Sequence, residues 1–445
     1  MNKKFDAIII GAGVIGCPIA YELSKMGYKT LNVDKLPDAG EGSTAGSCAI
    51  VRAHYSTADG VAMAYEGFKY WLNWENYLDN VTDEKGLARY MNTGSLLLKS
   101  QGHDWKKVQK NYDEVGVKYE EWDNDQIRKM VPVADLHEFW PVKRPEDPSF
   151  YDEPTKELEG GIFCPEGGYV NDPALSAHNI MRAAEAKGGK FMFNAEVVDV
   201  RSENGRVTGI TLKDGTQIDA GIVVNVGGPH SFLINKMAEG VWEGCNIKTK
   251  ALRHEVMYCP APEDYDYLND GYHMSDGDIG CYVRPEVGNT FLIGSEDPDC
   301  DPQEWVDPDA FYAGKGGHGK DNVLTDEQWK AQCYRLGKRI PTLSVPNQPK
   351  GVVDLYDCSD DWIPVYDKSD LPGYYMAIGT SGNQYKNAPV VGHMMAQLIE
   401  ACEKGLDHDK EPMQYKFKYT DRSTDVGFFS RKREINYNSS FSVNG

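Results

Sequence analysis

The sequence predicts an α/β fold, α+β overall, in which two interleaved domains are built on sheets of different kinds. A strand, a glycine-rich turn and a helix follow one another at the start of the chain, a pattern typical of parallel sheets. Short strands joined by turn residues recur after residue 190 and favour antiparallel pairing there. The 445 residues also exceed what one hydrophobic core usually serves.

The first unit is a strand, a glycine turn and a helix. Residues 5–10 form an apolar run typical of a buried strand, and apolar residues at helical spacing follow the turn. Gly11 permits the tight turn, Gly13 lets a pyrophosphate approach the backbone, and Gly16 lets helix and strand pack closely. The turn therefore predicts a Rossmann-like dinucleotide site, whose binding residues are Gly11, Gly13, Val14, Ile15 and Gly16.

The second strand, residues 29–34, ends on an acid. Asp34 lies about 20 residues beyond the turn, where dinucleotide sites hydrogen-bond a ribose 2′-hydroxyl. A free 2′-hydroxyl favours FAD or NAD over NADP. We expect Asp34 and the adjacent Lys35 to contact the cofactor.

A segment rich in glycine and small hydroxyl residues extends from Gly40 to Arg52. Its backbone amides and hydroxyl groups suit a pyrophosphate and the flank of an isoalloxazine ring, and the segment ends on a cation. The residues of this segment that we expect at the cofactor are Ser43, Thr44, Ser47 and Cys48.

Charge and cysteine content narrow the possible partners. The net charge of −21 repels nucleic acid and anionic membrane surfaces, so we expect no nucleic-acid partner. No apolar stretch reaches the roughly 18 residues of a membrane span, and none is expected. The ten cysteines form no Cys-x-x-Cys pair, which indicates reduced thiols, no metal site and a cytoplasmic protein.

Five segments in order resemble the D-amino-acid-oxidase-like superfamily of FAD-dependent oxidoreductases, in the branch of monomeric sarcosine oxidase, glycine oxidase and dimethylglycine dehydrogenase. The resemblance spans most of the chain and implies FAD rather than NAD alone. Beyond the N-terminal unit, the resemblance rests first on a Gly-Gly-x-Val-x-Pro-like segment at 161–173, which precedes a helix at 174–187, and on hairpin strands at 190–200, 207–213 and 217–219. It rests next on a strand with a glycine pair at 222–228. The last segment is a closing motif at 375–392, which leads into a helix at 394–402.

The resemblance implies further cofactor contacts. They fall at Val197, Gly227, Gly228, Gly379, Gly382, Asn383, Gln384 and Lys386. The flavin-linking cysteine of sarcosine oxidases would fall near Asp354, and no histidine occupies the attachment position of dimethylglycine dehydrogenases. We therefore expect non-covalent FAD, with Cys48 as the one thiol near the expected ring.

Two cations fall where sarcosine oxidases hold the substrate carboxylate. Arg52 and Lys386 match the arginine and lysine of that clamp without a gap in spacing. An arginine fork and a lysine point charge together suit a carboxylate. Tyr385 precedes the lysine, and Tyr282, Arg284 and His254 are further candidates to line the pocket, although each also suits a packed sheet.

Two positions depart from the family pattern. Leu292 stands where sarcosine oxidases carry an oxygen-activating lysine, and Glu296 replaces a neighbouring histidine. The electron acceptor is left open for this reason.

The predicted activity is FAD-dependent oxidation of the C–N bond in a small carboxylate-bearing amine, either an N-methyl amino acid or an amino acid. One alternative is an FAD-dependent 2-hydroxy-acid or polyol dehydrogenase, because Arg52 and Lys386 would hold those anions equally well. Another is a catalytically silent flavoprotein that binds a partner.

The resemblance also implies how the chain divides. We expect the FAD-binding domain at 1–90, 155–245 and 350–402, a substrate domain on a mostly antiparallel sheet at 91–154 and 246–349, and a surface arm at 403–445 with a frayed end. The acidic segment 297–322 is a candidate lid or oligomer contact. Thr325 opens a capping box and a helix follows it.

Overall fold

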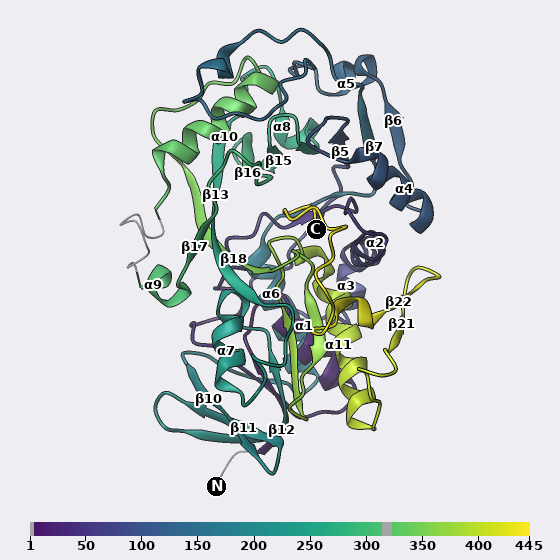
Figure 1. Cartoon of the computed structure of the whole chain (residues 1–445), viewed down its shortest axis with the longest axis vertical. Coiled ribbons are helices and arrows are strands. Elements are labelled where there is room, and N and C mark those ends of the chain that lie inside the picture. Colours follow the sequence, from purple (N-terminus) through teal and green to yellow (C-terminus); the bar gives the residue numbers. More distant parts are fainter. Residues whose placement is uncertain (1–3, 314–322) are drawn as a thin grey trace.

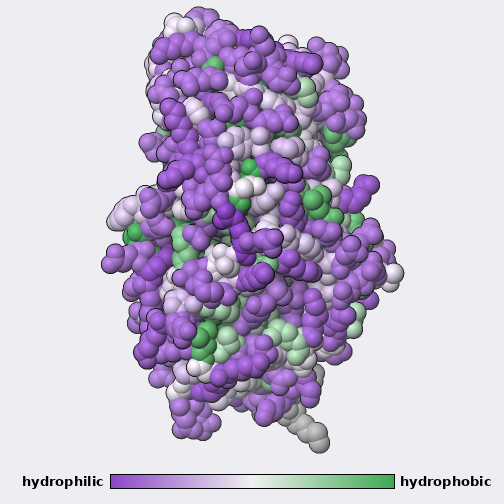
Figure 2. Space-filling model, turned by 90° about the vertical axis from the view of Figure 1, so that its right-hand side faces the viewer, coloured by the Kyte–Doolittle hydropathy of each residue, from purple (hydrophilic) through white to green (hydrophobic). Residues whose placement is uncertain are grey.

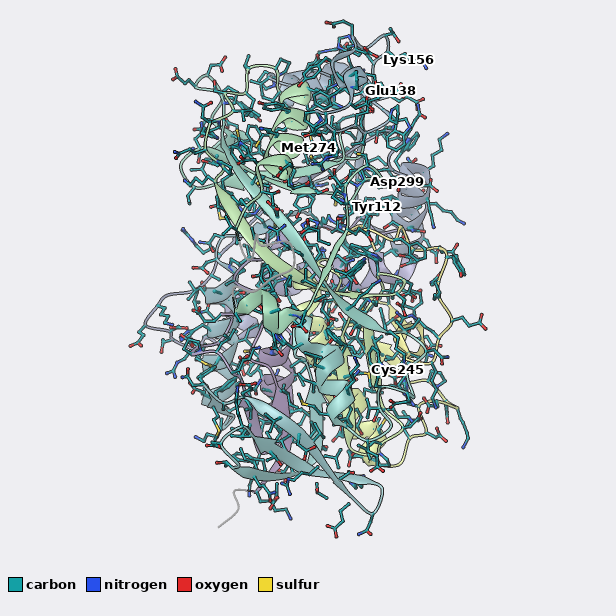
Figure 3. The ribbon with its side chains drawn as sticks, turned by 60° about the vertical axis from the view of Figure 1, so that its left-hand side comes forward. Tyr112, Glu138, Lys156, Cys245, Met274 and Asp299 are labelled. Atoms are coloured by element: carbon teal, nitrogen blue, oxygen red, sulfur yellow. The ribbon has the colours of Figure 1, made fainter. Side chains whose placement is uncertain are left out.

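The computed structural model describes residues 4–313 and 323–445, which form an elongated molecule of two halves (Figure 1). Each half contains one large sheet, and the long strands β13 (Thr249–Pro260) and β18 (Gly351–Ser359) run from one half toward the other. The rest of the predicted lid segment, residues 314–322, lies outside the described residues. In the view with side chains, Met274 lies in the upper half and Cys245 in the lower half (Figure 3).

The lower half contains an eight-stranded sheet with a parallel centre. Its hydrogen-bonded order is β10-β11-β12-β1-β2-β9, and β20 joins β12 and β19. The pairs β1·β2, β1·β12, β2·β9 and β12·β20 are parallel, which confirms the predicted sheet. The strands are β1 (Lys4–Ile10), β2 (Thr30–Val33), β9 (Lys190–Met192), β10 (Val197–Glu203), β11 (Arg206–Leu212), β12 (Gln217–Asn225), β19 (Val365–Lys368) and β20 (Tyr374–Ile378).

Two strand predictions in this sheet were wrong. The single strand expected at 190–200 is divided into β9 and β10, because Asn194 adopts a positive φ of 53° and turns the chain. There the amide of Asn194 donates to the carbonyl of Leu36. The segments expected separately at 217–219 and 222–228 share one continuous strand, β12, which ends at Asn225.

Three helices cover this sheet: α1 (Gly16–Lys25), α6 (Pro173–Ala186) and α11 (Ala388–Glu403). α1 packs on both of the others. A Cβ atom at Gly392 would lie 2.5 Å from Cβ of Pro18, so α11 approaches α1 closely. The helix predicted at 394–402 begins earlier, at Ala388, because Pro389 stands in its first turn, where proline needs no hydrogen-bonded amide.

The upper half contains a nine-stranded, mostly antiparallel sheet ordered β17-β13-β16-β15-β14-β5-β7-β6, with β18 on β13. Besides β13 and β18, its strands are β5 (Ser95–Leu98), β6 (Glu120–Trp122), β7 (Gly161–Cys164), β14 (His273–Asp276), β15 (Cys281–Glu286), β16 (Thr290–Ser295) and β17 (Glu304–Val306). β7 and β18 belong to this sheet although both fall inside ranges expected for the FAD-binding domain. The division at those two strands stays a proposal.

Helix α10 (Asp326–Arg339) packs on the second sheet, and its predicted start is confirmed because Thr325 accepts a hydrogen bond from the amide of Gln328. The remaining helices are α2 (Ala58–Leu72), α3 (Trp74–Tyr77), α4 (Trp105–Val115), α5 (Asn124–Met130), α7 (Ser231–Met237), α8 (Tyr267–Asp270) and α9 (Pro308–Tyr312). The remaining strands are β3 (Ile50–Val51), β4 (Tyr90–Met91) and β8 (Gly168–Val170) in one small sheet, and β21 (Gln414–Lys416) and β22 (Ser423–Asp425) in another.

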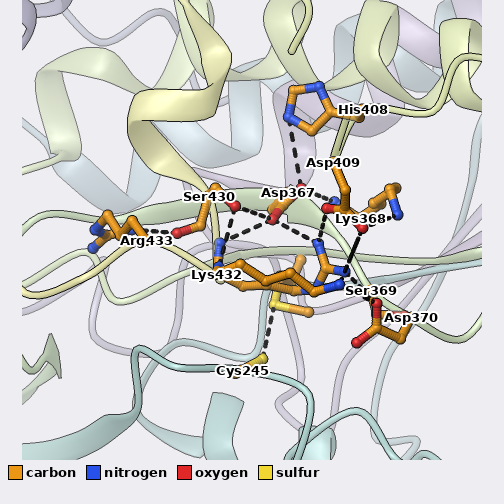
Figure 4. Close-up of polar contacts among 12 residues, drawn as sticks. Cys245, Asp367, Lys368, Ser369, Asp370, His408, Asp409, Ser430, Lys432 and Arg433 are labelled. Carbon is orange, nitrogen blue, oxygen red and sulfur yellow. Dashed lines mark hydrogen bonds and ion pairs between the residues drawn. The ribbon is translucent and has the colours of Figure 1, made fainter. Parts of the chain in front are cut away.

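The segment 403–445 is tied to the lower half by polar contacts around Asp367, and Figure 4 shows Ser430 of this segment bonded to it. The guanidinium of Arg431, which is fully buried, pairs with Asp367 at 2.9 Å, Asp370 at 2.6 Å and Asp409 at 2.9 Å. From there the chain returns to the junction of the halves, where its end is marked in Figure 1. The end is not frayed as expected, since Val443 is only 5% exposed.

Replacing Arg431 by methionine is expected to lower the free energy of unfolding by about 3 kcal/mol, because it leaves the buried Asp367 carboxylate without its cation. Urea unfolding followed by circular dichroism measures the change. Lys410→Met is the control, since Lys410 is exposed and pairs with Asp407 on the surface. Equal stabilities of the two variants would contradict this account.

The surface is strongly polar, as the charge of the chain requires. Figure 2 shows a largely hydrophilic face on which apolar side chains appear only in scattered patches. Among the described residues, the helices include none whose length and apolar character would allow it to cross a membrane.

Candidate active site

One elongated cavity connects the two halves of the molecule. Its walls include the end of β1 and the glycine turn, the end of β2, the segment 42–52, the loop after β12 and the loop after β20. At the other end the walls come from β14, β15, β18 and residues 443–444. The glycine turn and the end of β2 belong to the part expected to hold a dinucleotide, whereas Arg52, Lys386 and the walls from β14 and β15 belong to the part expected to hold a substrate.

The glycine turn is packed so closely that a Cβ atom would not fit at two of its positions. Gly11 has a φ of +124°, and a Cβ atom there would lie 2.5 Å from the carbonyl oxygen of Val226. At Gly16 a Cβ atom would lie 2.4 Å from the carbonyl oxygen of Gly11. Thr44 braces the turn, because its hydroxyl accepts from the amide of Val14 at 3.1 Å. The bare backbone at Gly13 thus faces the cavity, as a bound pyrophosphate requires.

Asp34 joins the end of β2 to this turn. Its carboxylate accepts from the amide of Ala12 at 2.7 Å and from the amide of Leu36 at 2.9 Å. Burial raises the pKa of Asp34, although these bonds oppose the shift. The side chain also lies on the cavity wall. Its contact with a ribose hydroxyl stays a prediction.

Most of the cofactor residues expected from the sequence lie on the cavity wall. They are Gly11, Gly13, Val14, Ile15, Asp34, Lys35, Ser43, Thr44, Ser47, Cys48, Val197, Gly227, Gly228, Gly382, Asn383, Gln384 and Lys386. Gly16 and Gly379 lie behind it. Gly16 sits where α1 meets the turn, and the amide of Gly379 donates to the carboxylate of Asp357 at 2.7 Å.

Arg52 and Lys386 are brought together in the middle of the cavity, around the ring of Tyr55. Both are buried and both line the wall. The guanidinium carbon of Arg52 and Nζ of Lys386 each lie 4.9 Å from the centre of the Tyr55 ring. Arg52 donates to the carbonyls of His54 and Val443, and Lys386 donates to the Tyr55 hydroxyl at 2.8 Å. We expect these two buried cations to hold an anion together, and we name the pair the anion site.

Binding of a carboxylate at this anion site is expected to weaken as pH rises. Burial, and then the charge of Arg52, hold the pKa of Lys386 well below its ordinary value of 10.5. A bound carboxylate raises that pKa, so binding takes up a proton between the lowered and the raised value. The affinity is therefore highest below the pKa of the free lysine and falls about tenfold per pH unit above it, until the raised pKa is passed.

The measurement for this pH dependence is the Kd of acetate, an unreactive carboxylate, followed by the absorbance of the bound flavin. Lys386→Met should make the affinity weaker but flat across the same pH range. A native profile without a slope would contradict the assignment of Lys386 to the anion site.

Tyr282 and Tyr356 form an aromatic wall opposite the segment 42–52. The Tyr282 hydroxyl lies 3.3 Å from Sγ of Cys48, and a Cβ atom at Gly382 would lie 2.4 Å from the Tyr356 ring. Burial raises the pKa of the Cys48 thiol, which keeps it protonated and poorly nucleophilic. Cys48 is therefore poorly suited to attach a flavin.

Three other candidates have structural partners. His254 lies outside the cavity wall, because it stacks behind Tyr356 with ring centres 4.4 Å apart and bonds Asp297 at 3.0 Å. Arg284 is also behind the wall and donates to the carbonyl of Cys48 at 2.7 Å. Tyr385 lies on the wall, while its hydroxyl lies 2.7 Å from that of Ser176.

Sequence reasoning missed several residues at the substrate end. They are Ser275, Glu296, Tyr356, Val443 and Asn444, all on the cavity wall. Glu296 could have been recognised from the sequence, since it replaces a histidine of the family that the chain resembles. Val443 could not have been recognised, because its contact with Arg52 joins residues 391 positions apart.

The parallel sheet, the bare glycine turn and the acid at the end of β2 together define a dinucleotide-binding protein, and a cavity lies beside them. The sequence matches the family described as FAD dependent oxidoreductase over residues 6–398. The chain belongs to this family and is an FAD-dependent oxidoreductase.

Known proteins are similar to this chain, some along nearly its whole length and one along about half of it. The sarcosine oxidase subunit beta of Rhodobacter capsulatus is 24% identical over 434 residues, which are 92% of this chain and 90% of the relative. A glycerol 3-phosphate dehydrogenase of Caloramator mitchellensis is 30% identical over 236 residues, 52% of this chain and 44% of the relative. The crystal structure of L-proline dehydrogenase from P. horikoshii superposes with a TM-score of 0.73 at 21% identity, covering 97% of this chain and 98% of that one.

Proposed function

We propose that this enzyme oxidises the C–N bond of a small amine that carries a carboxylate, an amino acid or N-methyl amino acid, to an imine. The observation that carries the proposal is the anion site of Arg52 and Lys386, which opens into the same cavity as the glycine turn. The relative named as a sarcosine oxidase subunit supports an amine substrate, because sarcosine is an N-methyl amino acid. Its carboxylate is a group that this site is suited to hold.

Each part of the cavity then has a role in the proposed reaction. FAD, which the glycine turn and Asp34 would hold, would supply the two-electron oxidant that takes a hydride from the carbon bonded to nitrogen, while the nitrogen gives up a proton and the C–N single bond becomes a double bond. The arginine fork and the lysine fix the carboxylate, so the carbon next to it is held in one orientation. Tyr282, which is buried, and Tyr356, which is partly buried, shield the reacting bond from water.

A 2-hydroxy-acid or polyol dehydrogenase is the second candidate. The glycerol 3-phosphate dehydrogenase relative favours it, and Arg52 and Lys386 suit a phosphate or the carboxylate of a hydroxy acid as well as that of an amino acid. The two candidates differ in the bond that is oxidised, and hence in the product.

The test is to supply matched amino acids and 2-hydroxy acids to the holoenzyme and to measure carbonyl product and released amine. A dye should serve as electron acceptor beside oxygen, since Leu292, where an oxygen-activating lysine is expected, packs with Cys48 and Tyr282. Release of ammonia, of methylamine, or of the demethylated amino acid together with formaldehyde supports amine oxidation. Carbonyl product from hydroxy acids alone would overturn it in favour of the second candidate.

The flavin is expected to be bound without a covalent link. Asp354 occupies the position of the family's linking cysteine, and Cys48 is a protonated thiol that already contacts Tyr282. Precipitation of the holoenzyme with acid should release all the yellow colour into the supernatant. Flavin retained in the protein pellet, and lost from it in Cys48→Ala, would show that Cys48 forms a bond.

A further inference from the structure

A carboxylate faces the substrate end of the cavity and the proposed chemistry has not used it. Glu296 follows β16 directly, is 7% exposed and lies on the cavity wall. The hydroxyl of Ser275, from β14, donates to one carboxylate oxygen. Nε2 of His103 lies 2.6 Å from the other oxygen. Glu296 is thus fixed from two neighbouring elements.

His103 holds Glu296 from behind. Its side chain is 9% exposed, and it is absent from the cavity wall. Burial works against protonation, but the Glu296 carboxylate outweighs it and raises the pKa of His103. The side-chain nitrogen Nδ2 of Asn444 lies 3.3 Å from Nε2 of the same imidazole. The imidazole orients the carboxylate and leaves its cavity-facing lone pairs free for a ligand.

The charges around the substrate end are divided by sign. Arg52 and Lys386 supply the cations, while Glu296 is an acid on the cavity wall beside Ser275. The acids that β18 adds to the wall already have protein partners, because Asp354 accepts from the Tyr312 hydroxyl and Asp357 accepts from the amide of Gly379. A zwitterion presents a carboxylate to the cations and an N–H donor to the acid. A 2-hydroxy acid or an ether acid offers the same carboxylate but lacks the cationic donor.

We propose that Glu296, fixed by Ser275 and His103, binds the amine nitrogen of the substrate and selects zwitterionic amino acids over their oxygen analogues. This inference rests on the proposed function and deepens it by naming the substrate class. An N–H donor gains a charge-assisted hydrogen bond from Glu296, whereas an ether oxygen turns its lone pairs toward the carboxylate. Binding should favour the nitrogen ligand by roughly 10- to 100-fold.

Two ligand pairs of equal shape test the selection: sarcosine against methoxyacetate, and L-proline against tetrahydrofuran-2-carboxylate. The Kd of each is measured on the holoenzyme without oxygen, from the change in flavin absorbance that precedes any bleaching. Glu296→Gln should reduce the preference for nitrogen to near unity and leave the Kd of the oxygen ligands within about threefold. Glu296→Asp should restore part of the preference.

Glu304→Gln is the matched control, because Glu304 lies in the same sheet, on β17, but outside the cavity wall. It should keep the native preference. A native protein that binds both members of each pair equally, or a Glu296→Gln variant that keeps the preference, overturns the inference. If both members of a pair bind tightly and equally, only the role of Glu296 is overturned, and the anion site is retained. If no carboxylate binds at all, the proposed function is overturned as well.

Discussion

Replacing Arg52 by methionine is expected to weaken the binding of carboxylate ligands by about 100-fold or more while FAD stays bound. The guanidinium is buried and supplies the forked donor of the anion site, so its loss removes charge-assisted bonds that water cannot replace. Lys386 remains, which prevents complete loss. The measurement is the Kd of acetate and the KM of any amine that the native protein oxidises.

Because Arg52 also donates to the carbonyls of His54 and Val443, the variant needs a check of its fold. Flavin content and Tm provide it, and Arg52→Lys should recover part of the affinity by restoring the charge without the fork. Arg182→Met is the control, since Arg182 is exposed and pairs with Glu185 on the same helix. Unchanged carboxylate binding in a folded Arg52→Met protein would remove the carboxylate from the proposed substrate.

The second large effect concerns the glycine turn. A methyl group at Gly16 would lie 2.4 Å from the carbonyl oxygen of Gly11 and 2.8 Å from Val226, so Gly16→Ala must shift the backbone that faces the pyrophosphate. We expect FAD affinity to fall by about 100-fold, which corresponds to roughly 3 kcal/mol. The purified variant should be nearly colourless.

Gly221→Ala is the matched control for this change. Gly221 lies in β12 of the same sheet, its φ is not positive, and a Cβ atom there meets nothing within 4 Å. That protein should keep its full complement of FAD. A yellow Gly16→Ala protein with native FAD affinity would show that close packing at the turn is not required.

The dinucleotide end was predictable because its signals are local. Strand, turn, helix and second strand follow one another within the first 34 residues, and the atoms that a Cβ would meet at Gly11 and Gly16 belong to Gly11 and Val226. The start of α11 was missed because Pro389 was not recognised as a residue of the first helical turn. The break at Asn194 depends on a backbone contact with Leu36, which no pattern of hydropathy reveals.

The substrate end was less predictable because its parts are distant in sequence. Arg52 and Lys386 were found through family resemblance, and their meeting around Tyr55 is a tertiary contact. Val443 and Asn444 lie on the cavity wall at the end of a segment that Arg431 anchors to the buried Asp367. His254 was expected in the pocket, yet the sheet places it behind Tyr356. Composition and spacing carry no information on such contacts.

The most direct test of the account is an anaerobic titration of the holoenzyme with small amino acids and N-methyl amino acids, followed by the absorbance of the bound flavin. We predict that at least one such amine bleaches the flavin completely, and that Arg52→Met requires a far higher concentration of it for the same change. A flavin that stays oxidised with every carboxylate-bearing amine, while a hydroxy acid or polyol bleaches it, would contradict the central claim.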